Sequence, residues 1–268
     1  MKTIKRFKKS VSIWIFILLL SAPVSYINAQ GLLPGEGSDK DWNFVITPYI
    51  WFSALNGQIG VATVEADFDA SFSDIFSNMN IGFMMYGEVR YKRFGLAIDL
   101  LTVNLGIEGT RPVTGGAVNA EQKVTFLETS LLYSLVHNEK WSADIHLGVR
   151  TWWMNTTMDA ERIMDLEPIR VESDLSWVDP IVGMNAVFLP HQKWPLNARF
   201  DIGGFGAGSE FTWNLQAGAG YRFAKAWTVL LQYRVLGVDY QEGEQGSPEY
   251  FKYNARQFGP LVGFMATF

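Results

Sequence analysis

The chain has no cysteine, only three histidines and, beyond its first thirty residues, no long apolar run. Without cysteine, neither a disulfide framework nor a thiolate metal site can form. No later stretch approaches the roughly 18 apolar residues that a spanning helix needs. Basic residues are outnumbered, with 22 Lys and Arg against 27 Asp and Glu, so we expect no nucleic-acid partner.

The N-terminus has the features of a secretory signal peptide. "MKTIKRFKKS" is basic without an acid, "VSIWIFILLL" is a short apolar core, and Ala29 is a small residue at a cleavage point. We interpret 1–29 as the signal peptide, 30–41 as a periplasmic lead-in and 42–268 as a transmembrane barrel. An uncleaved anchor helix is the alternative for 1–29. Cleavage would place the mature protein outside the cytoplasm.

Apolar residues then alternate with others over long stretches. In "WPLNARFDIGGFG", Leu196, Ala198, Phe200 and Ile202 share one face. A period of two over ten or more residues indicates strands long enough to cross a membrane when tilted. The pattern predicts an all-β protein, a closed antiparallel up-and-down transmembrane β-barrel of about ten strands, within a range of eight to twelve. The segments are 42–53, 80–91, 94–107, 121–136, 141–155, 171–188, 194–206, 210–223, 226–240 and 251–268.

The connections alternate in length. "YKRF", "HNEK", "PHQK" and "AKA" are short, whereas 54–79, 108–120, 156–170 and 241–250 are longer. Outer-membrane barrels have short periplasmic turns and longer extracellular loops. We therefore expect an integral protein of the cell outer membrane of a Gram-negative cell, with both termini on the periplasmic side.

Aromatic residues flank the short turns. Their rings have an apolar body and a polar edge, which suits the level of the lipid headgroups. A soluble barrel or sandwich with an aromatic rim is the alternative. The predicted girdle, with outer-membrane lipid as its partner, consists of Trp42, Tyr91, Phe94, Trp141, Phe188, Trp194, Phe223, Trp227 and Phe268.

The chain ends "GPLVGFMATF", with apolar residues on alternate positions up to Phe268. In a closed barrel this last strand must pair with the strand at Trp42, because lipid tolerates no open sheet edge. The ending also resembles the C-terminal targeting signal of outer-membrane barrels. That resemblance implies the barrel-assembly machinery as a partner during insertion.

Strand parity places almost balanced charges on the inner face. Buried charges must be paired, and arginine meets carboxylates in a bidentate manner. The balance favours a packed lumen over an open channel, because a selective pore usually carries a surplus of one sign. The predicted network is Glu88, Arg90, Asp99, Glu128, Asp144, His146, Arg150, Asp179, Arg199, Asp201, Arg222 and Arg234.

The first long loop is too apolar for a solvated segment. "VATVEADFDA" alternates like a hairpin arm, and "SFSDIFSNM" could form a short helix that starts near Ser73 or Asp74. One hypothesis is a plug in the barrel mouth that buries Phe72, Ile75 and Phe76. The other is an extension of the first hairpin above the membrane, and twelve strands would follow if the segment joined the wall.

Catalytic signals are weak. His146 shares the inner face with Asp144, but no serine is identifiable as a nucleophile, and no metal-ligand spacing or phosphate-binding loop is present. We therefore expect no enzyme, cofactor or metal.

Several segments resemble an uncharacterised family of small, porin-like Gram-negative outer-membrane β-barrel proteins. They are "ITPYIW", "DASFSDIF", "WVDPIVG", "RFDIGGFGAGSEFTWNLQAGAGYRF" and "YRVLGVDYQEG", and the similarity covers about 42–268. The resemblance implies fold and location but no activity. The sequence therefore predicts an envelope-structural barrel or a narrow channel for small solutes. An enzyme acting on lipid or peptide, and a binding barrel that acts through its loops, are the alternatives.

Overall fold

The computed structural model describes residues 42–61, 64–110, 117–160, 169–245, 247 and 250–268. The proposed signal peptide and the lead-in up to residue 41 lie outside them. The elements are β1 (Trp42–Trp51), β2 (Ala54–Val61), β3 (Val64–Ala70), α2 (Phe72–Ser77), β4 (Met79–Tyr91), β5 (Phe94–Thr110), β6 (Ala117–His137), β7 (Trp141–Ala160), β8 (Ile169–His191), β9 (Trp194–Gly204), β10 (Phe211–Ala224), β11 (Trp227–Glu242) and β12 (Phe251–Thr267).

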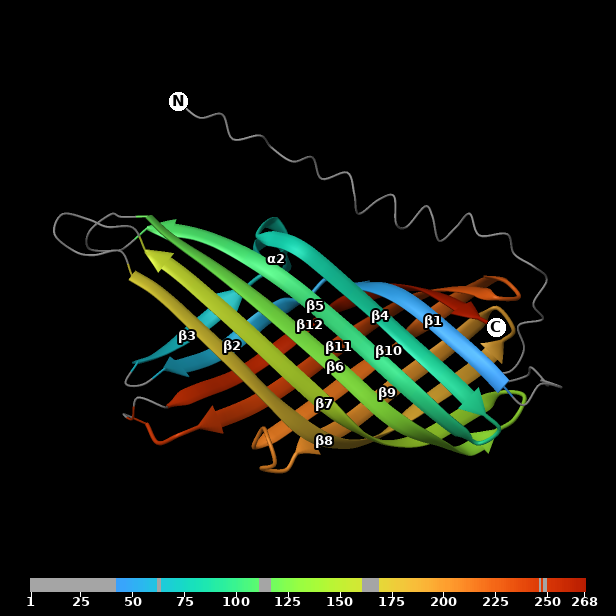
Figure 1. Cartoon of the computed structure of the whole chain (residues 1–268). Helices are drawn as coiled ribbons and strands as arrows, with labels where there is room; N and C mark the ends of the chain where they lie inside the picture. The colour runs from blue at the N-terminus through green and yellow to red at the C-terminus, as the bar shows by residue number, and fades with distance from the viewer. Residues whose placement is uncertain (1–41, 62–63, 111–116, 161–168, 246, 248–249) are drawn as a thin grey trace.

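Ten of these strands close into a barrel (Figure 1). Each long strand pairs antiparallel with its neighbours, from β4 round to β12, and β1 pairs with both β4 and β12. The last strand closes the ring through pairs such as Val45 with Thr267 and Ile50 with Val262. The structure confirms the predicted closed antiparallel barrel. We call the end with the short connections the turn end and the opposite end the loop end.

The first long loop forms a hairpin and a helix instead of a plug. β2 pairs with β12 from Ala54 to Val61, and β3 pairs with β2, so the sheet has twelve strands although the ring has ten. Ser71 caps α2, and its hydroxyl and the Asp74 carboxylate form a capping box.

The plug hypothesis for Phe72, Ile75 and Phe76 is wrong. α2 contains no buried residue, and 55% of Phe76 is exposed. The hairpin follows the edge of β12 beyond the ring, so its helix lies at the outer rim and not in the lumen (Figure 1).

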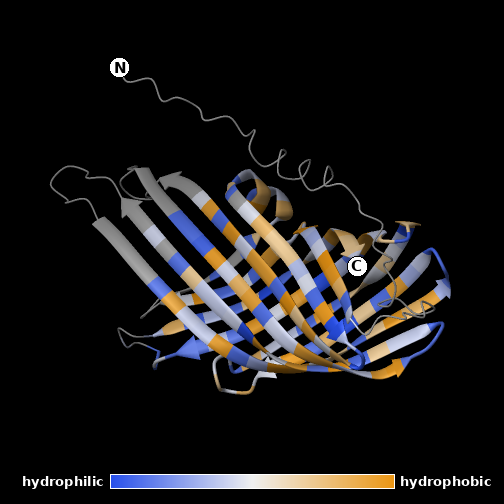
Figure 2. Ribbon diagram, turned by 45° about the vertical axis from the view of Figure 1, so that its right-hand side comes forward, coloured by the Kyte–Doolittle hydropathy of each residue, from blue (hydrophilic) through white to orange (hydrophobic). Residues whose placement is uncertain are grey.

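The outer face carries an apolar belt. Along β1 exposed and buried residues alternate, with Phe44, Ile46 and Ile50 facing outwards. Other strands continue the belt with residues such as Leu147 and Leu231, which are 63% and 61% exposed. Figure 2 shows the alternation of apolar and polar residues along the strands. Large apolar side chains on the outside of a closed barrel require lipid as their solvent, so this is a transmembrane β-barrel.

No helix among the described residues is long and apolar enough to cross a membrane.

Aromatic rings cluster in pairs at the turn end. The ring centroids of Trp42 and Tyr91 are 4.8 Å apart, and those of Trp141 and Phe188 are 4.3 Å apart. The other predicted girdle residues lie at the same end, on strands that begin or end there. Their rings also contact three residues that the sequence prediction omitted: Phe94 contacts Tyr133, Trp194 contacts Tyr221, and Phe223 and Trp227 both contact Phe264.

Candidate functional site

The lumen contains a layer of paired charges. The alternation of each strand turns these side chains inwards, where most are buried: Arg150, Asp179 and Asp201 have no exposed surface. We call the paired set the charge layer; it comprises Glu88 and Arg90 on β4, Asp99 on β5, Glu128 on β6, Asp144 and Arg150 on β7, Arg199 and Asp201 on β9, and Arg234 on β11.

Arg150 is at the centre of the charge layer. Its Nη2 donates to Glu128 Oε2 at 2.8 Å and to Asp201 Oδ1 at 2.6 Å, and its Nη1 donates to Thr212 Oγ1 at 3.0 Å. Arg199 pairs with the other oxygen of each of these two carboxylates. Two guanidinium groups therefore neutralise two carboxylates in a space from which solvent is excluded.

Two further pairs flank this centre. Arg234 Nη1 donates to Asp99 Oδ2 at 2.9 Å, and the Tyr49 hydroxyl donates to Asp99 Oδ1 at 2.6 Å. Arg90 Nη1 donates to Asp144 Oδ1 at 2.9 Å, and its Nε donates to Glu88. The layer thus links six of the ten barrel strands across the lumen.

Two predicted members have a different environment. Asp179 accepts hydrogen bonds from the backbone and hydroxyl of Ser209, at 2.6 and 3.0 Å, and from Trp177 Nε1 at 3.2 Å. It therefore anchors the turn between β9 and β10 at the loop end. Arg222 is half-buried near the turn end, beside an irregularity in the β10–β11 pairing.

His146 is almost wholly buried, with 1% exposed, and neither ring nitrogen has a hydrogen-bond partner. Its Nε2 lies 3.9 Å from Asp201 Oδ2, whereas the sequence suggested a pair with Asp144. His146, Glu128 and Asp201 could offer three ligand atoms to a metal ion. Both carboxylates are already engaged by Arg150 and Arg199, so a cation there would have to displace guanidinium groups. Among the described residues, no hydroxyl hydrogen-bonds to His146 as a nucleophile would.

Next to the charge layer, on its loop-end side, lies an aromatic layer. Its rings contact one another in series: Phe126 and Trp152 are tilted with centroids 5.2 Å apart, whereas Trp152 and Trp177, at 5.6 Å, and Trp177 and Tyr240, at 4.2 Å, are stacked. Among the described residues, its buried members are Tyr49, Trp51, Leu101, Phe126, Trp152, Met154, Trp177, Leu236, Val238, Tyr240 and Leu261.

The two layers contact each other. The guanidinium carbon of Arg150 lies 5.6 Å from the centroid of the Phe126 ring, and that of Arg234 lies 5.3 Å from the same ring. Arginine over an aromatic face is an attractive arrangement when water is excluded. The sequence prediction recognised the charges but did not recognise this layer.

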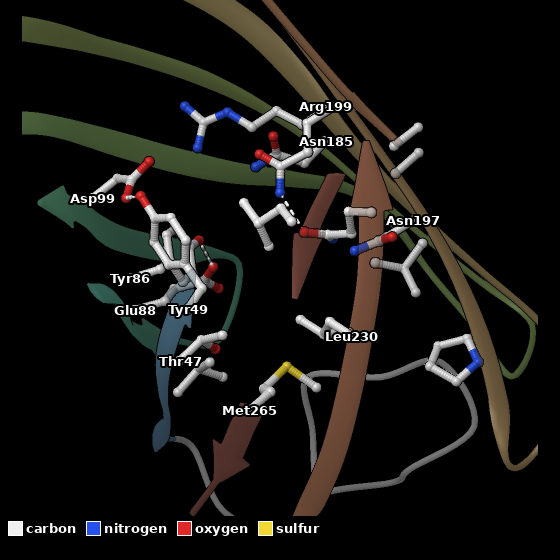
Figure 3. A pocket seen from close by; sticks show the side chains of 18 of the residues that line it. Thr47, Tyr49, Tyr86, Glu88, Asp99, Asn185, Asn197, Arg199, Leu230 and Met265 are labelled. Carbon is white, nitrogen blue, oxygen red and sulfur yellow. Dashed lines mark hydrogen bonds between the residues drawn. The ribbon is translucent and has the colours of Figure 1, made fainter. Parts of the chain in front are cut away.

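On the turn-end side of the charge layer is a chamber of about 180 Å³ (Figure 3). Tyr49, Asp99 and Arg199 line its inner part, and Asn197 and Met265 line it closer to the turns. The chamber is amphipathic, because amides and ion-paired charges share its wall with leucine, valine and methionine side chains.

No protein-family model matches the chain, and no curated protein sequence matches it. Among solved structures, the transport unit of the autotransporter AIDA-I from Escherichia coli is similar at 8% identity. That match covers 88% of this chain and 93% of the other, with a TM-score of 0.46. OprG, an outer membrane protein from Pseudomonas aeruginosa, is similar at 10% identity, with 87% and 98% coverage and a TM-score of 0.36. Ail, the attachment invasion locus protein of Yersinia pestis, gives 9% identity, 85% and 99% coverage and a TM-score of 0.36. These likenesses concern the fold alone.

Proposed function

We propose that this protein is a non-enzymatic, integral outer-membrane barrel whose resting lumen is closed, and that it serves the structure of the envelope. Bacterial single-chain barrels with an even strand number, short turns and aromatic girdles belong to outer membranes, which supports this location. Its partners would be outer-membrane lipid and, during insertion, the barrel-assembly machinery.

The observation that carries the proposal is the charge layer itself. Arg150, with no exposed surface, connects Glu128 and Asp201 across the lumen, and the aromatic layer lies directly behind it. A conducting pore needs a continuous water-filled path with binding weak enough for ions to leave. Two dense layers in series oppose such a path.

A narrow conduit for small solutes is the second candidate, and the chamber favours it. A cavity of about 180 Å³ lined by Tyr86, Asn185, Gln216 and Arg199 could hold a small polar molecule at the turn end. Passage would then require both layers to rearrange.

Planar-bilayer conductance of the refolded full-length protein tests the proposal. We expect no steady current from the wild type, and none after deletion of residues 57–78, because neither layer contains them. Trp152→Ala alone should also be silent, since the charge layer remains. Steady conductance steps in the wild type would contradict a closed lumen, and steps that appear only after the deletion would restore a plugging role for that segment.

A further inference from the structure

The barrel wall is interrupted where β1 and β4 separate. Their ladder runs from Trp42 with Tyr91 to Pro48 with Met85 and stops there. Proline has no backbone N–H to continue the pairing. Beyond it, β1 pairs only with β12, and the stretch Met79–Met84 of β4 pairs only with β5 among the described strands. We call the junction without backbone pairing, between residues 49–53 and this edge of β4, the seam.

A side chain closes the seam in place of a backbone ladder. The backbone N–H of Trp51 donates to Sδ of Met84 at 3.3 Å, and thioether sulfur is a weak acceptor. Met84 faces inwards and packs against the aromatic layer, of which Trp51 is a member. Methionine is flexible and adapts to its neighbours. The contact between β1 and β4 at this point therefore depends on one adaptable side chain.

The outer approach to the seam is apolar. Ile50, Phe83 and Met85 are 48%, 46% and 37% exposed on the adjoining strands. Met84 is seven residues from Tyr91 in the girdle, so at about 3.3 Å per residue and a tilt near 40° it lies roughly 18 Å above that level. This height falls within the apolar band of a membrane barrel, which is about 25 Å tall.

A row of aromatic rings lies at the loop-end limit of the seam. The centroids of Phe52 and Phe72 are 5.1 Å apart, and those of Phe72 and Phe76 are 5.4 Å apart. α2 thus extends the apolar lining from the strand junction to the exposed ring of Phe76. The residues predicted as a plug lie where an apolar chain would approach the seam from the bilayer.

We propose that the seam is a docking site for an acyl chain of a membrane lipid, which inserts between β1 and β4 and contacts Trp51 and Met84. Lipid is the source because the seam lies at the height of the hydrocarbon, where acyl chains are the solvent. An apolar stretch along one unpaired strand edge fits a linear chain. It leads directly to an apolar layer in a lumen, which in membrane barrels is usually polar.

A phospholipid that carries a diazirine in one acyl chain tests the proposal on the native protein in phosphatidylcholine vesicles. After irradiation, the labelled residues are mapped by peptide mass spectrometry. We expect label on the inward-facing Trp51 and Met84. Label confined to outward residues such as Ile50 and Phe83 would overturn the proposal, because any barrel wall contacts lipid there. Inward label from diazirine-bearing free palmitate, with none from the phospholipid, would overturn the assignment to a lipid.

Two alanine variants form a matched pair for the same experiment. Met84→Ala enlarges the seam, whereas Leu236→Ala removes similar volume from the aromatic layer behind the continuous β10–β11–β12 wall. We expect a several-fold rise in Trp51 label for the first and no change for the second. Equal changes in both would overturn the seam as the route of entry. Folding of Met84→Ala is judged by its gel mobility before and after heating. If this variant does not fold, the labelling pattern of the native protein alone tests the proposal.

Discussion

The two layers of the lumen occupy neighbouring positions on the same strands but are held together differently. On four strands, a residue of the charge layer is followed two residues towards the loop end by a large apolar residue of the aromatic layer. These neighbours are Asp99 and Leu101, Glu128 and Phe126, Arg150 and Trp152, and Arg234 and Leu236. One layer thus depends on specific partners and the other on volume and ring contact.

That difference has energetic consequences. A buried charge whose partner is removed keeps its full desolvation cost, so the charge layer tolerates single changes poorly. An apolar layer tolerates swaps that preserve volume, because its contacts are numerous and individually small. Single substitutions should therefore lower the free energy of unfolding strongly in the charge layer and only moderately in the aromatic layer.

The largest effect is expected from Arg150→Met in the charge layer. The change leaves Glu128 and Asp201 with only the Arg199 guanidinium between them, so one negative charge is uncompensated, and breaking a buried ion pair costs about 3–5 kcal/mol. Urea unfolding of the refolded barrel, followed by tryptophan fluorescence, measures this loss.

The control for Arg150→Met is the double variant Arg150→Met with Asp201→Asn, which removes the carboxylate charge that Arg199 alone does not balance. It should recover part of the lost free energy of unfolding. If Arg150→Met unfolds at the wild-type urea concentration, the paired-charge description of this layer is wrong.

A smaller effect is expected in the aromatic layer. Phe126→Leu keeps an apolar side chain of similar size, so we expect a loss of about 1.5 kcal/mol or less. Loss of the ring contacts to Trp152 and the two arginines accounts for most of it. The same urea experiment compares it with Arg150→Met; a loss as large as that of Arg150→Met would remove the distinction between the layers.

Alternation alone predicted the architecture and the inward set of charges, because a strand side chain can point only to one of two faces. It could not predict which arginine meets which carboxylate, since that depends on the stagger between strands. Parity did place Trp152 on the inner face, so the aromatic layer could have been found by following the large apolar residues among the charges.

Of the two hypotheses for the first long loop, the plug failed for an identifiable reason. It would have buried the apolar residues of the loop in the lumen, whereas β2 continues along β12 and carries α2 to the outer rim. The signal was present in "ITPYIW", where Pro48 is a poor residue for the middle of a continuous ladder.

The smallest effect concerns α2. It contributes to neither layer, so it should unfold while both layers stay folded. Hydrogen bonds from the Ser71 hydroxyl and backbone N–H lower the pKa of the Asp74 carboxyl. Because the folded pKa is below that of the unfolded chain, the cap is fully effective above about pH 3.9 and is lost as the pH falls through the lowered value. The amide hydrogen exchange of Ile75, corrected for its intrinsic rate, should therefore accelerate in the wild type as the pH falls below that range.

The variant Asp74→Asn is the control. Its urea midpoint at neutral pH should equal that of the wild type, and its Ile75 exchange should not change over the pH range in which Asp74 titrates in the wild type. If acid leaves the exchange rate of Ile75 unchanged in the wild type, or if Asp74→Asn lowers the urea midpoint of the barrel, α2 unfolds together with the barrel. The comparison of the two layers must then include α2.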